Sequence, residues 1–79
     1  MFTCKSWEWE QISIDKNQYD KLLKYPTTIS ENNVKDIEVY QLFINGEKHN
    51  CFHVRWVLKG SLPNLELFFT SDNYNNIVA

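Results

Sequence analysis

The stretch from Asp36 to Lys59, DIEVYQLFINGEKHNCFHVRWVLK, decides the fold of this chain. Asn45-Gly46 divides two runs that are rich in β-branched and aromatic residues. This pair is typical of a two-residue type I′ turn, because both central residues of such a turn take positive φ. The stretch therefore predicts a β-hairpin over roughly 36–45 and 48–59.

A tight turn also fixes which residues of the two strands lie opposite each other. Continued outward without interruption, the register predicts three polar pairs: Asp36 with Arg55, Glu38 with His53, and Tyr40 with Cys51. The other face of the hairpin is then apolar and carries Ile37, Val39, Phe43, Phe52, Val54, Trp56 and Leu58. We expect that apolar face to form the core.

The region before the hairpin predicts a strand and then a helix. Residues 7–10, WEWE, alternate with the period of a strand, and residues 1–5 are interpreted as its beginning. Ile12 and Ile14 continue on the opposite parity, which predicts a bulge or the end of the strand near Gln11.

The helix is predicted between two local signals. Asp15 has the side chain of a helix N-cap, and Pro26 ends the helix. Between them Tyr19, Leu22 and Leu23 recur at helical spacing and form one apolar stripe.

The region after the hairpin predicts one more strand. Leu65, Leu67 and Phe69 alternate with Glu66 and Phe68, whereas residues 71–76 are polar and are expected to form a capping turn or a frayed end. The order β-α-β-β-β predicts an α+β fold: a small, largely antiparallel sheet of about four strands with one helix packed on one face. We expect residues 1–79 to form a single domain.

Composition excludes some classes of function. The net charge is -2 and Arg55 is the only arginine, which argues against a protein that holds nucleic acid through a basic surface. No apolar run is long enough to span a bilayer and no signal-peptide pattern is present. We therefore expect a cytoplasmic protein without membrane contact, in which Cys4 and Cys51 are reduced thiols.

One motif contains residue types that bind metal ions. His49, Cys51 and His53 alternate along one strand, but the two histidines are four residues apart, or about 13 Å in a strand. One ion with bonds of about 2.0–2.3 Å cannot bind both. No nucleophile with a credible base is recognisable either, so we expect no metal, no cofactor and no enzymatic activity.

Two surfaces remain as candidates for binding: the polar face of the hairpin and the N-terminal strand. Trp7 and Trp9 could be either core residues or exposed ones. Aromatic residues beside an arginine are typical of binding hot spots. The candidate binding residues are Trp7, Glu8, Trp9, Glu10, Glu38, Tyr40, His53 and Arg55.

By elimination, the sequence predicts a non-enzymatic module that binds another protein or a ribonucleoprotein complex. Asn, Lys, Ile, Phe and Tyr total 31 residues against six of Ala, Arg, Gly and Pro, a bias that indicates an AT-rich genome. With the small size, this favours a phage or mobile-element inhibitor of a host defence complex, of the anti-CRISPR or anti-restriction type. The alternatives are an immunity or antitoxin protein, and a nucleic-acid-associated protein that uses an aromatic strand face. A free edge strand could also pair with a second copy of the chain.

Overall fold

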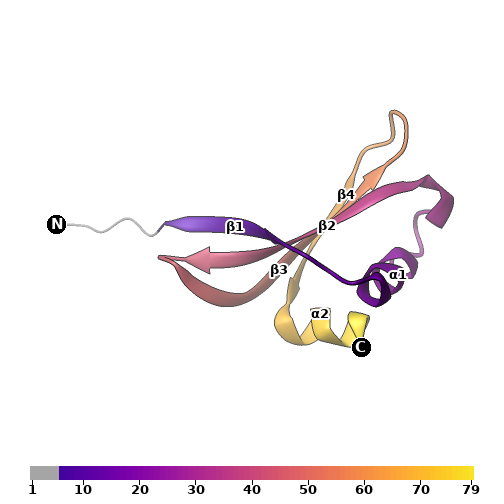
Figure 1. The fold of residues 1–79 in the computed structure, drawn as a ribbon. Coiled ribbons are helices and arrows are strands. Elements are labelled where there is room, and N and C mark those ends of the chain that lie inside the picture. Colours follow the sequence, from indigo (N-terminus) through magenta and orange to yellow (C-terminus); the bar gives the residue numbers. More distant parts are fainter. Residues whose placement is uncertain (1–5) are drawn as a thin grey trace.

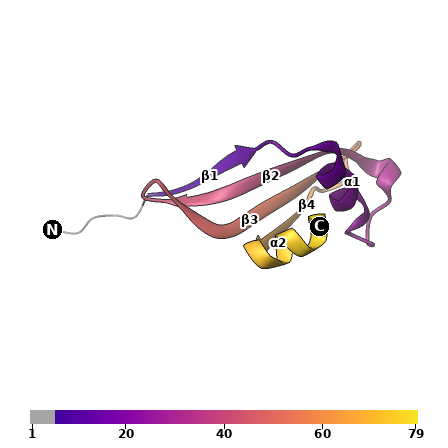
Figure 2. The same cartoon turned by 60° about the horizontal axis from the view of Figure 1, so that its bottom comes forward.

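The computed structural model describes residues 6–79, which form one antiparallel sheet in the order β1-β2-β3-β4. The strands are β1 (Trp7–Ile12), β2 (Val34–Ile44), β3 (Glu47–Leu58) and β4 (Leu65–Thr70). The helices are α1 (Lys16–Lys24), α2 (Ser71–Val78) and the short 3-10 helix η1 (Glu31–Asn33). Both α-helices lie on the same face of the sheet (Figures 1 and 2). The predicted α+β fold with a four-stranded antiparallel sheet is confirmed. The expectations for residues 1–5, including Cys4, fall outside the described residues.

The predicted hairpin turn is present. Asn45 has φ 53° and Gly46 has φ 81°, the two positive angles that a type I′ turn requires. The turn is tied to the start of β1, because the Asn45 side chain accepts a hydrogen bond of 3.0 Å from the backbone N–H of Ser6. The turn that joins β2 to β3 is therefore at Asn45-Gly46, as predicted.

The register of the hairpin changes away from the turn. Near the turn Ile44 lies opposite Glu47, as an uninterrupted ladder requires. Between the pairs Phe43–Lys48 and Gln41–Phe52, one residue of β2 faces three residues of β3. The three predicted polar pairs are consequently wrong by two positions: Glu38 lies opposite Arg55, Tyr40 opposite His53, and Asp36 opposite Val57.

The apolar core explains this shift. An uninterrupted register would put Trp56 opposite Lys35, whereas the observed one pairs Trp56 with Ile37. A second irregularity beside Lys35 then pairs Val34 with Leu58, so apolar residues face each other along the ladder. Because the shift near the turn is an even number of residues, every side chain keeps its predicted face.

Strand β1 ends close to the predicted position. It pairs with β2 without any shift in register and ends at Ile12, one residue after Gln11, so the strand ends there and does not bulge. Ile12 and the two glutamates of β1 lie on the helix side, and Ile12 packs against the core. The helices cover only that end of the sheet, and the turn end of the hairpin projects beyond them (Figure 2). On the helix side of β1, the residues are therefore polar where no helix covers the strand and apolar where the helices begin to cover it.

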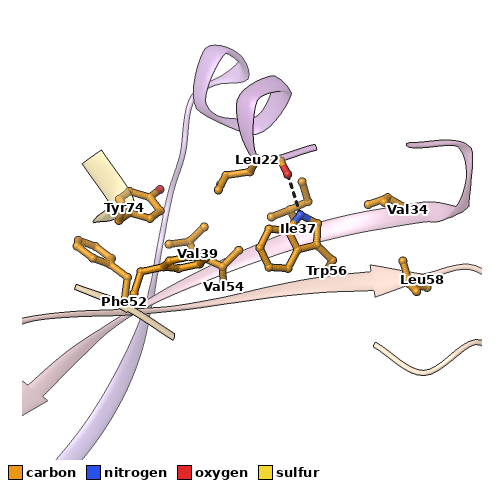
Figure 3. Close-up of a cluster of buried hydrophobic side chains, with 10 residues drawn as sticks. Leu22, Val34, Ile37, Val39, Phe52, Val54, Trp56, Leu58 and Tyr74 are labelled. Atoms are coloured by element: carbon orange, nitrogen blue, oxygen red, sulfur yellow. Dashed lines mark hydrogen bonds between the residues drawn. The ribbon is translucent and has the colours of Figure 1, made fainter. Parts of the chain in front are cut away.

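The core lies between the sheet and both helices (Figure 3). Trp56 is fully buried, and its indole Nε1 donates a hydrogen bond of 2.9 Å to the carbonyl oxygen of Leu22 in α1. Phe52 stacks on Tyr74 of α2 with ring centroids 4.4 Å apart. As predicted, α1 begins after Asp15, whose Oδ1 accepts a hydrogen bond of 2.8 Å from the backbone N–H of Gln18.

Helix α2 replaces the capping turn or frayed end that was expected for residues 71–76. The Thr70 hydroxyl caps it by accepting a hydrogen bond of 3.3 Å from the backbone N–H of Asn73. Tyr74, Ile77 and Val78 then recur at helical spacing and pack against the core. Among the described residues, no helix is long and apolar enough to cross a membrane.

Candidate binding face

Within residues 6–79, no helix covers the face of the sheet opposite α1 and α2, and we call it the open face. Directly paired residues of an antiparallel ladder share a face, so the register determines its members. They are Trp7, Trp9 and Gln11 of β1; Asp36, Glu38, Tyr40, Leu42 and Ile44 of β2; Glu47, Cys51, His53, Arg55 and Val57 of β3; and Glu66, Phe68 and Thr70 of β4.

Four aromatic rings, one from each strand, meet at the centre of the open face. His53 stacks on Phe68 with centroids 4.5 Å apart and planes 14° from parallel. Trp9 and Tyr40 both lie 5.7 Å from the His53 ring, and Trp9 lies 5.6 Å from Phe68. These four residues form the aromatic cluster. Such separations are favourable for aromatic pairs.

The cluster leaves much apolar surface in contact with solvent. Phe68 is 63% exposed, and Trp7, at the end of β1, is 62% exposed. Leu42, directly opposite Trp9 in the ladder, is only 5% exposed although it lies away from the helices. The open face therefore combines the buried Leu42 with the exposed aromatic side chains of Trp7 and Phe68.

A row of charged side chains crosses the sheet beside the aromatic cluster. Glu38, Arg55 and Glu66 lie directly opposite one another on β2, β3 and β4. Arg55 Nη1 is 3.7 Å from Glu38 Oε1, and Arg55 Nε is 4.0 Å from Glu66 Oε1. His53 Nε2 approaches Glu66 Oε1 to 3.1 Å without the alignment of a hydrogen bond. One guanidinium thus faces two carboxylates.

Tyr40 joins the charged row to the aromatic cluster. Its hydroxyl donates a hydrogen bond of 2.9 Å to Glu38 Oε1. Burial, and then this hydrogen bond, raise the pKa of Tyr40 above its usual 10.0. The phenol is therefore a neutral donor at physiological pH, and Glu38 is held in place by both Tyr40 and Arg55.

The structure brings six of the eight candidate residues onto one surface: Trp7, Trp9, Glu38, Tyr40, His53 and Arg55. The two surfaces considered from the sequence are thus one, because β1 pairs with β2. Glu8 and Glu10 do not join it. They lie on the helix side of β1 and are exposed there, since the helices do not reach them.

The candidate list lacks three residues that contact the aromatic cluster or the charged row: Leu42, Glu66 and Phe68. A signal for Phe68 is present in the sequence, because it has the parity of Glu66 in a strand whose other parity is apolar. In a half-buried strand, an aromatic residue at one of the alternate positions that face solvent indicates an exposed ring. No comparable signal marks Leu42, which is buried by its place opposite Trp9.

The motif His49, Cys51 and His53, considered above for a metal site, is interrupted by the register shift. Among residues 6–79, no group of three or more His, Cys, Asp and Glu side chains is arranged to hold an ion. The register shift falls across residues 48–52, so His49 lies within the irregularity while His53 lies in the regular ladder. His53 contacts aromatic rings and Glu66 instead.

Comparisons of the chain with protein-family models, with curated proteins and with solved structures found no match. The site is therefore interpreted from its own geometry.

Proposed function

We propose that the open face binds another protein, and that the chain acts through this contact and not through catalysis. The observation that carries the proposal is the exposure of Phe68 in the aromatic cluster and of Trp7 on the same face. Exposed aromatic residues that share a face with buried apolar side chains are typical of an interface core. Trp, Tyr and Arg are also the residue types enriched at binding hot spots.

The charge of the open face supports a protein partner over a nucleic acid. Arg55 is the one Lys or Arg residue among the described members of the open face, whereas Glu38 and Glu66 lie beside the aromatic cluster and Asp36 and Glu47 lie near the ends. A phosphate backbone would meet more carboxylates than basic groups on this surface. The complementary partner presents an apolar area bordered by lysine or arginine.

The more specific form of the proposal is an inhibitor encoded by a phage or mobile element, acting on a protein or ribonucleoprotein of a host defence system. Its support is the small size of the chain and the residue bias of an AT-rich genome. An immunity or antitoxin protein would use the open face in the same way. The identity of the captured partner distinguishes these cases.

The test is affinity capture with the tagged full chain from a host lysate, with and without nuclease, read by mass spectrometry. Trp7→Ala and Phe68→Ala each remove an exposed ring from the open face. Leu62→Ala is the matched control, because Leu62 is 49% exposed but lies in the β3–β4 turn. We expect one stoichiometric protein that survives nuclease, is lost with the two face variants and is retained by the control.

Two results would overturn the proposal. If the Leu62→Ala variant loses the partner while Trp7→Ala and Phe68→Ala retain it, the open face is not the binding surface. If single-stranded oligonucleotide binds with a strong dependence on salt and no protein survives nuclease, the aromatic cluster is a base-stacking surface instead.

A further inference from the structure

The sheet of the described chain has two free edges, β1 and β4, and they differ in chemistry. Within β4 the only charged residue is Glu66, and the strand contains neither Lys nor Pro. An edge strand with little charge and no proline is open to pairing with another strand. The charges of the two edge strands determine which edge is able to pair with a second copy of the chain.

Symmetric pairing constrains the register. Two copies of one strand that pair about a two-fold axis, with matching faces, place one residue opposite itself. For β1, the residue on the two-fold axis near the middle of the strand is either Trp9 or Glu10. With Trp9 on the axis, Glu8 lies opposite Glu10 of the second copy. With Glu10 on the axis, the two copies of Glu10 lie opposite each other. Like charges directly opposite each other destabilise a sheet. The charges of β1 therefore oppose self-pairing.

We propose that two copies of this chain pair through β4, antiparallel and with Phe68 on the two-fold axis. Phe68 then faces Phe68 of the second copy on the open face, and Leu67 faces Phe69 on the helix side. Glu66 faces Thr70, so no like charges meet. The contact sets the most exposed of the large apolar side chains in the described chain beside its copy, and both rings remain on the open face.

A groove on the helix side of β4 contains apolar side chains that a second copy can contact. This shallow groove of about 490 Å³ lies next to Leu65 and Leu67, and its remaining lining is the segment 25–28. Both leucines are partly exposed in the single chain. Pairing of β4 with β1 of another copy would set Glu8 and Glu10 beside these leucines, so the closed two-fold arrangement is favoured over an open-ended one.

The dimer does not rest on the proposed partner, but it changes the surface that a partner meets. Two sheets joined at β4 form one eight-stranded sheet with both open faces on the same side. The two aromatic clusters then lie next to each other across the seam. A partner would meet a surface twice as wide, with two-fold symmetry.

Disulfide trapping of the full-length chain tests the register. In a Cys4→Ser, Cys51→Ser background, Phe68→Cys places two thiols directly opposite each other, within the Cα separation that a disulfide needs. Gln11→Cys is the matched control, since Gln11 is an exposed open-face residue of the other edge. We expect mild oxidation to give a covalent dimer with Phe68→Cys and a monomer with Gln11→Cys. Covalent dimers from Gln11→Cys alone would overturn the proposal.

Sedimentation velocity gives an independent measurement that needs no new cysteine. The wild-type chain is expected to sediment with twice the mass of one chain at about 100 µM and to dissociate on dilution. Phe68→Glu, which sets two carboxylates opposite each other, should sediment as a monomer, whereas Leu62→Glu should not change the mass. A wild-type chain that remains monomeric at every concentration would refute β4 pairing.

Discussion

Replacing Trp56 with Phe tests the link between the sheet and α1 that organises the core. Trp56 is fully buried near the C-terminal end of β3, and its indole N–H donates a hydrogen bond to the Leu22 carbonyl. Phenylalanine keeps most of the apolar contact but has no donor. The substitution therefore measures one hydrogen bond and part of one ring without adding a charge.

The expected loss can be worked out from two contributions. The Leu22 carbonyl keeps a 3.3 Å bond from the backbone N–H of Tyr25, so it is not orphaned, and losing the indole bond costs about 1 kcal/mol. Complete truncation of a buried Trp costs about 3–5 kcal/mol, and Phe forfeits roughly a third of that, about 1–1.5 kcal/mol. The total is about 2 kcal/mol, or a fall in Tm of roughly 8–16 °C for a domain of this size.

Urea unfolding followed by far-UV circular dichroism measures this loss without relying on tryptophan fluorescence. The midpoint should fall while the m-value stays unchanged. Trp7→Phe is the control, because Trp7 is 62% exposed, and its effect should stay within about 0.5 kcal/mol. A loss below about 0.5 kcal/mol for Trp56→Phe, or an equal loss for Trp7→Phe, would refute the placement of the core.

Three further substitutions test single features of the fold by urea unfolding. Asp15→Ala removes the acceptor that caps α1 and should cost about 1 kcal/mol, whereas the exposed Asn17→Ala in the first turn should not destabilise. Gly46→Ala should cost about 1–2 kcal/mol because the residue has φ 81°, although a Cβ there meets no atom; an unchanged midpoint would contradict the turn geometry. Tyr74→Phe should stabilise the chain by about 1 kcal/mol at pH 7, because the buried Tyr74 hydroxyl has no hydrogen-bond partner among residues 6–79. Burial raises the pKa of Tyr74 above 10.0, so the stability that the neutral phenol contributes is present below pH 10 and lost as pH rises through the raised pKa. The Phe variant should therefore lose less stability than the wild type between pH 9 and 11, and an equal loss would place the tyrosine in solvent.

The sequence predicted the elements that carry local signals. The Asn45-Gly46 turn, the cap at Asp15 and the alternation in β4 each determine structure within a few residues, and the structure has all three. The register shift at residues 48–52 has no such signal. It arises because Trp56 must face Ile37 and not Lys35, which is a requirement of the assembled core.

Helix α2 and the shared open face depend on tertiary packing in the same way. The segment from Ser71 is polar by composition, and it becomes a helix because Tyr74 stacks on Phe52 of β3. Trp9 joins His53 only because β1 pairs with β2, which the sequence leaves undetermined. Candidate residues could therefore be named from the sequence, but their assembly into one surface required the sheet order.

The most direct test of the account is the dissociation constant of the captured partner for four proteins: wild type, Trp7→Ala, Phe68→Ala and Leu62→Ala. Trp7 lies on β1, away from the β4 edge, so its variant separates loss of the partner from loss of the dimer. We expect Trp7→Ala and Phe68→Ala each to weaken binding by about 30-fold, as for a hot spot of about 2 kcal/mol, and Leu62→Ala to leave it unchanged. Equal affinities for all four proteins would contradict a binding role for the open face.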